Sequence, residues 1–121
     1  MKTLNELSKE VHQNAVKHGW WENERGFGEI IALCHSELSE SLEEYRNNMP
    51  VAYYFDDEHC IDENIENAEG RKLEGIGVEL ADCMIRILDY CGKENIDIQK
   101  LVELKHEYNK SRPYKHGGKV I

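Results

Sequence analysis

Apolar residues recur at helical spacing in four stretches of the chain, and this pattern sets the expected fold. The four stretches span about 3–18, 28–48, 76–91 and 98–112. Thr3 and Asp97 stand at the start of the first and fourth stretches and belong to residue types that cap helix N-termini. Gly19 and Gly92 follow the first and third stretches and are expected to end them. The pattern predicts an all-α fold, a four-helix-bundle-like single domain over residues 1–121.

A long acidic segment, residues 49–74, separates the second and third helical stretches. It has no clear periodicity and exceeds the connections that are usual in helical bundles. Such a segment is typically a lid, a binding segment or disordered, and we treat it as an insert within the domain.

Several acidic residues of the second stretch lie beside its apolar face. On a helical wheel, Glu37, Glu40 and Glu44 fall at or near the edge of that face, whereas Glu43 falls well outside it. Two side chains three residues apart on a helix have Cβ atoms about 5–6 Å apart, so Glu37 and Glu40 can reach one cation.

The third stretch is apolar around most of its circumference, which is typical of a buried helix. One polar stripe runs along it, formed by Glu79, Asp82, Arg86 and Asp89. Arg86 can pair with Asp82 or Asp89, and a structural ion pair with Asp89 is favoured. Glu79 has no basic residue one turn away, and a buried carboxylate is costly unless it is paired or binds metal. Glu79 and Asp82 are expected to face Glu37 and Glu40 of the second stretch, and four carboxylates without a soft ligand suit Mg²⁺ or Mn²⁺.

The fourth stretch carries polar donors on the same side as its apolar residues. Lys105, Asn109 and Arg112 follow one another at i, i+4 and i+7 on that side, whereas a purely solvating face would lie opposite. With Lys115 in the Gly-rich tail, they predict a clamp for an oxyanion, most naturally phosphate. For Lys105 and Arg112, the alternative is that each side chain extends past the apolar face to water.

Composition narrows the possible functions. The chain has 24 acidic and 15 basic residues, and its net charge of −9 disfavours binding to a nucleic-acid polymer. A phosphate ligand remains possible, because a metal ion can lie between acids and phosphates. No apolar run suits a signal peptide or a membrane span. The four cysteines form no C-x-x-C pair, so reduced cysteines in a cytoplasmic protein are expected, with zinc at His59 and Cys60 as a weak alternative.

Three segments of the chain, "SELSESLEEYR", "EGIGVELADCMIRILDY" and "KHEYNKSRPYKHGGK", resemble the MazG-like, all-α nucleoside triphosphate pyrophosphohydrolases. The family signature is Glu-x-x-Glu on one helix and Glu-x-x-Asp on a later one. In this chain the four positions are Glu37, Glu40, Glu79 and Asp82. The similarity covers residues 27–46 and 74–119.

The chain departs from the family pattern around the insert. The 38 residues between Glu40 and Glu79 exceed the short connection of compact MazG domains, and Leu73 stands where the closest relatives are expected to have proline. Both differences affect the segment in which substrate choice is expected to reside.

The resemblance implies a helical bundle that assembles as a homodimer or homotetramer. It implies Mg²⁺-dependent hydrolysis of a ribo- or deoxynucleoside triphosphate to the monophosphate and pyrophosphate, with Mn²⁺ as a possible substitute. The four signature acids would hold the metal, and the fourth-stretch donors Lys105, Asn109 and Arg112 would contact phosphates.

Further roles follow from the expected chemistry. Glu40 or Glu44 could take the proton of the attacking water. Trp20 and Trp21 could stack on the base, and the alternative is that both fill the core or a subunit interface.

Two other classes fit parts of the pattern. A non-enzymatic oligomerisation or regulatory module with a structural cation explains the acids but not the inward donors of the fourth stretch. A di-iron carboxylate bundle needs Glu-x-x-His on two helices, and only Glu103 with His106 fits, with Glu103 turned away from the core.

Overall fold

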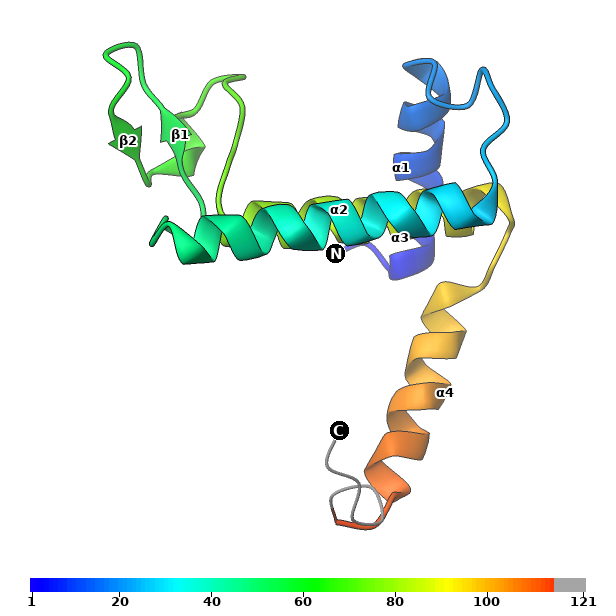
Figure 1. Ribbon diagram of the computed structural model, residues 1–121. Coiled ribbons are helices and arrows are strands. Elements are labelled where there is room, and N and C mark those ends of the chain that lie inside the picture. Colours follow the sequence, from blue (N-terminus) through cyan, green and yellow to red (C-terminus); the bar gives the residue numbers. More distant parts are fainter. Residues whose placement is uncertain (115–121) are drawn as a thin grey trace.

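The computed structural model describes residues 1–114, in which four α-helices and one small two-stranded sheet form the fold (Figure 1). The helices are α1 (Leu4–Lys17), α2 (Phe27–Arg46), α3 (Ile76–Lys93) and α4 (Ile98–Ser111). The insert between α2 and α3 contains β1 (Tyr54–Phe55), β2 (Ile61–Asp62) and the 3-10 helix η1 (Ile65–Asn67). The all-α prediction is confirmed. No helix within residues 1–114 has both the length and the apolar character needed to cross a bilayer.

Capping chemistry explains where the helices begin and end. The Thr3 hydroxyl accepts a hydrogen bond from the Glu6 N–H, and the Glu6 carboxylate accepts one from the Thr3 N–H, which is a capping box. The Asp97 carboxylate accepts from the Lys100 N–H at the start of α4. Gly19, at φ +83°, follows α1 as predicted.

Gly92 was predicted to end the third helix, and this prediction is wrong. α3 continues past Gly92, and Asn95, at φ +54°, makes the left-handed turn instead. Gly92 is needed because α1 crosses it closely: a Cβ there would lie 2.7 Å from both the His12 Cβ and the Ser8 carbonyl oxygen. At the same contact, the Ser8 hydroxyl donates to the Leu88 carbonyl at 2.5 Å.

The core is small and is centred on α3, against which α1 and α2 pack. Its buried apolar side chains on the helices are Ile30, Cys34, Cys83, Leu88 and Cys91. The three buried cysteines are free, as predicted. The prediction that the third helix is buried nearly all round does not hold within one chain. Exposed apolar residues remain on α2 (Leu38, Leu42, Tyr45) and α3 (Leu80, Met84, Ile87), each at least 42% exposed.

α4 extends away from the α2–α3 pair (Figure 1). Its first turn is tied to α1, where the Gln99 side chain accepts from the Leu4 N–H and the Asn5 side chain accepts from the Gln99 N–H. Beyond that turn, no hydrogen bond or ion pair among the described residues joins α4 to another helix. Its predicted inner face is therefore 53–57% exposed at Leu101, Leu104 and Tyr108.

The insert folds back onto the N-terminus of α3. Tyr53 and Glu74 exchange two backbone hydrogen bonds of 2.8 Å, and the Val51 carbonyl accepts from the Gly77 N–H at 2.8 Å. Gly75 permits this approach: its φ is +125°, and a Cβ there would lie 2.5 Å from the Val51 oxygen. Both ends of the insert are thus fixed beside the first turn of α3.

The contact between α1 and α3 predicts an unusual response to a helix-favouring substitution. Alanine normally stabilises a helix relative to glycine, but Gly92→Ala should lower the free energy of unfolding by about 1–3 kcal/mol, because the added methyl meets the α1 backbone. Urea denaturation followed by circular dichroism measures this effect.

Gly28→Ala is the matched control, because Gly28 lies in α2 with nothing within 4 Å of an added Cβ. It should keep or raise the stability. Equal effects of the two substitutions would show that the close approach at Gly92 has no energetic consequence.

Candidate metal centre

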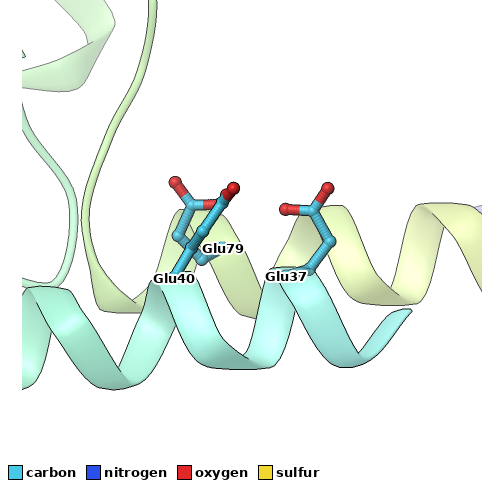
Figure 2. Close-up of side chains that lie close together, drawn as sticks. All are labelled: Glu37, Glu40 and Glu79. Carbon is cyan, nitrogen blue, oxygen red and sulfur yellow. The ribbon is translucent and has the colours of Figure 1, made fainter. Parts of the chain in front are cut away.

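Three carboxylates from two helices converge on one side of the α2–α3 pair. Glu37 and Glu40 project from successive turns of α2, and Glu79 projects from the first turn of α3 (Figure 2). One oxygen from each lies within 4.8 Å of the others. We call Glu37, Glu40 and Glu79 the carboxylate triad. Its convergence is the arrangement that the spacing of these acids predicts.

Glu79 is the most constrained member of the carboxylate triad. Its residue is only 8% exposed, and within the described chain its Oε2 atom has no hydrogen-bond partner. Burial, followed by the neighbouring carboxyl groups of Glu40 and Glu37, raises the pKa of Glu79 from 4.5 to about 8. Oxygens this close repel one another unless a proton or a cation lies between them. An all-oxygen donor set of this kind is what Mg²⁺ or Mn²⁺ prefers.

Asp82, the predicted fourth ligand, lies beside the carboxylate triad rather than within it. Burial and then the Glu37 carboxylate raise the pKa of Asp82, whereas hydrogen bonding with Glu79 and then the nearby cations of Arg86 and Lys72 lower it. Asp82 is half-buried and forms part of an adjoining cleft. It could therefore contact a cation from the cleft side.

This ligand cleft has a volume of about 410 Å³ and is bounded by α1, the loop after it, α2 and α3. Its polar and aromatic walls are His18, Trp20, Glu37, Asp82, Arg86 and Asp89. Because Glu37 belongs to both the ligand cleft and the carboxylate triad, a molecule in the cleft would lie directly beside a bound cation.

The two tryptophans have different environments. Trp20 lines the ligand cleft, and the guanidinium carbons of Arg25 and Arg86 lie 3.7 and 5.1 Å from its ring centroid. Trp21 donates from Nε1 to both oxygens of Asp89, at 2.9 and 3.1 Å. The indole of Trp21 is therefore fixed by a buried carboxylate, which favours a core role over base stacking.

The predicted ion pair between Arg86 and Asp89 is wrong. Asp89 is 6% exposed and bonds His12 Nδ1 at 2.8 Å in addition to Trp21. Arg86 instead donates from Nε to Glu37 Oε1 at 2.8 Å. The wheel of one helix could not reveal these partners, because they come from α1, the following loop and α2.

Glu44, a predicted candidate base, is held by the insert. The Tyr53 hydroxyl lies 3.1 and 3.0 Å from the two Glu44 oxygens and donates to them. Burial, followed by this hydrogen bond, raises the pKa of Tyr53 to about 12. Nothing in the spacing of the insert indicated Tyr53 as a partner of α2.

The predicted phosphate contacts do not meet the carboxylate triad within one chain. Lys105, Asn109 and Arg112 are here called the α4 triplet. Lys105 and Asn109 lie on the helix that leaves the α2–α3 pair, and Arg112 is the residue that follows its last turn (Figure 1). The Lys105 Nζ and the Arg112 guanidinium carbon lie 4.7 and 5.7 Å from the centroid of the Tyr108 ring. Lys115 lies outside the described residues.

The other metal sites considered from sequence gain no support from residues 1–114. The carboxylate triad is the one convergent group of three or more potential ligands in that part of the chain. No third ligand joins His59 and Cys60, and none joins Glu103 and His106 on α4.

The raised pKa of Glu79 gives the stability a pH dependence of defined sign. Between pH 4.5 and about 8 the folded chain holds a proton that the unfolded chain releases, so the contribution of this group falls as the pH rises. With a chelator present, the melting temperature should fall from about pH 5 to about pH 8, and Glu79→Gln should remove most of that fall. Adding Mn²⁺ at the upper pH should restore the parent protein only.

Thermal unfolding followed by circular dichroism tests this prediction. Glu43→Gln is the control. It removes the same charge from an exposed position on α2, outside the carboxylate triad, and should keep the pH dependence. An equal fall in the parent protein and in Glu79→Gln would contradict the burial of a proton or cation at the triad.

No protein-family model, curated protein or solved structure matches this chain.

Proposed function

We propose that this protein is a Mg²⁺-dependent nucleoside triphosphate pyrophosphohydrolase that releases the monophosphate and pyrophosphate, with Mn²⁺ as a possible substitute. The observation that carries the proposal is the buried Glu79 Oε2 atom, which lacks a donor inside a cluster of three carboxylates. A cation at this place supplies the missing partner and leaves positive charge facing an adjoining cleft. The sequence signature shared with MazG-like enzymes supports the same reading.

The acidic residues of the site would have different roles in the proposed reaction. The carboxylate triad would hold the cation, and Asp82 would reach it from the ligand cleft. The cation would neutralise charge on the triphosphate and favour deprotonation of the attacking water. Glu40 is the exposed member of the triad and so is best placed to accept the water proton. Glu44 is less suitable, because Tyr53 already donates to both of its oxygens.

The ligand cleft supports a place for the nucleoside. Trp20 presents an aromatic wall there, next to the Glu37 edge of the triad. Trp21 is tied to Asp89, so the proposal assigns base stacking to Trp20 alone. Stacking would require the Arg25 guanidinium, 3.7 Å from the ring centroid, to share or leave that position.

A homo-oligomer is part of the proposal. The exposed apolar residues of α2 and α3 and the stripe on α4 are surfaces that a second copy of the chain would cover. The α4 triplet, which includes two cations, is separated from the acids of its own chain. A neighbouring chain could bring its triplet to them, so that phosphate contacts arise between subunits. The cytoplasm remains the proposed compartment on sequence grounds.

Glu79→Gln tests the catalytic proposal. It should lower pyrophosphate release at least about 100-fold, because one anionic ligand is lost without a change in shape. The measurement is a panel of canonical, deoxy and damaged nucleoside triphosphates with Mg²⁺, scored for pyrophosphate against phosphate. Glu43→Gln, on the exposed side of α2, is the matched control and should keep the parent rate.

Parent-level release by a folded Glu79→Gln protein would exclude this mechanism. If Mg²⁺ raises the melting temperature and the parent protein consumes no nucleotide, a non-enzymatic module with a structural cation is the better account.

Mixed oligomers test whether the α4 triplet acts between subunits. Glu79→Gln and Arg112→Ala should each be inactive alone, but unfolding and refolding the two together should recover about a quarter of the parent activity in a dimer. A mixture of Glu79→Gln with Glu37→Gln is the control, because both changes affect the same site and no intact site can form. Recovery in neither mixture would contradict a contribution from the second chain.

A further inference from the structure

Arg86 connects the carboxylate triad to the ligand cleft. Its Nε donates to Glu37 Oε1 at 2.8 Å, and its guanidinium carbon lies 5.1 Å from the Trp20 ring centroid. The side chain is 27% exposed and lines the ligand cleft, whereas the Glu37 side chain is 10% exposed. Among the described residues, Arg86 is the cation that is hydrogen-bonded to the triad.

Most N–H groups of the Arg86 guanidinium have no hydrogen-bond acceptor within residues 1–114. The guanidinium carries five N–H groups, and the bond to Glu37 uses the one on Nε. No hydrogen bond joins its two Nη atoms to any group in residues 1–114. Asp89, on the same wall, is already occupied by Trp21 and His12. The planar Nη pair therefore remains available to an anionic ligand in the cleft.

The same ion pair opposes metal binding. A carboxylate oxygen engaged by a guanidinium has less electron density for a cation, and the fixed positive charge of Arg86 repels an incoming divalent ion. Without Arg86, the carboxylate triad would have no directly bonded cation and would attract metal more strongly. Arg86 thus compensates the triad while the metal is absent.

We propose that Arg86 is an exchangeable counter-ion, which neutralises Glu37 in the metal-free site and transfers its guanidinium to phosphate oxygens when a triphosphate enters the ligand cleft. This step rests on the proposed function for the identity of the ligand. The transfer frees Glu37 for the metal, so metal and triphosphate each favour binding of the other, as linkage requires. The sequence pattern placed Arg86 with other acids and did not suggest this role.

Mn²⁺ titration without nucleotide tests the counter-ion. Isothermal titration of Arg86→Gln should show a Kd for Mn²⁺ at least about threefold lower than that of the parent protein, because the competing charge is gone. Arg71→Gln is the matched control. Arg71 pairs with Asp57 on the insert, with 2.7 Å between Nη2 and Oδ1, so the substitution removes an equal charge outside the triad and should leave the Kd for Mn²⁺ unchanged. Arg86→Met is the second charge-removing variant if Arg86→Gln does not fold. An unchanged or raised Kd in the folded variant overturns the proposal.

Kinetics at saturating Mg²⁺ test the transfer to phosphate. Arg86→Lys keeps the charge but not the planar fork, so it should keep the parent Kd for Mn²⁺ and raise the KM for the triphosphate at least about fivefold. A lowered Kd for Mn²⁺ in Arg86→Gln with an unchanged KM in both variants overturns the phosphate contact. If the parent protein hydrolyses no nucleotide, the proposed function fails, and the Mn²⁺ titration still decides the counter-ion.

Discussion

The mutual repulsion of three carboxylates at the contact between α2 and α3 is the constraint on which the rest of the site depends. Helix packing places Glu37, Glu40 and Glu79 within reach of one another, and the burial of Glu37 and Glu79 limits the screening of their charges by water. The chain has three ways to relieve this repulsion: a proton on Glu79, the guanidinium of Arg86, or a divalent cation. The first two need no ligand, so the free protein can fold around the site, and in the proposed mechanism the third would replace them when metal and substrate bind.

Three of the four polar residues of the α3 stripe make different contacts that organise the molecule. Glu79 completes the carboxylate triad, and Arg86 balances it. One turn further along, Asp89 binds Trp21 and His12, which fixes the loop after α1 against the core. Gly92 then lets α1 cross at close range. The wall of the ligand cleft is therefore built by the same hydrogen bonds that hold α1 in place, and the position of Trp20 follows from its fixed neighbour.

The sequence predicted the parts of the site that depend on the periodicity of single helices. The 3.6-residue repeat indicates that Glu37, Glu40 and Glu79 lie beside apolar faces, and the cost of burial indicates that they need a partner. Partners across helices were not predictable in this way. The bond from Arg86 to Glu37 depends on the register between α2 and α3, and that from Tyr53 to Glu44 depends on how the insert returns. Gly92 was misjudged because a helix stop and a close crossing both favour glycine.

α4 illustrates why an amphipathic pattern reveals a covered side but not what covers it. The helix has 14 residues, and within residues 1–114 it is anchored to α1 only by its first turn. Isolated helices of about this length are marginal in water. Its stability therefore calls for a packing partner along the stripe that includes Leu101 and Leu104. In the proposed homo-oligomer, a second copy of the chain would satisfy this need and would also bring Lys105 and Arg112 within reach of an acidic site that lacks them. In the proposed assembly, the surface that stabilises α4 and the contacts that bind phosphate would arise from the same association.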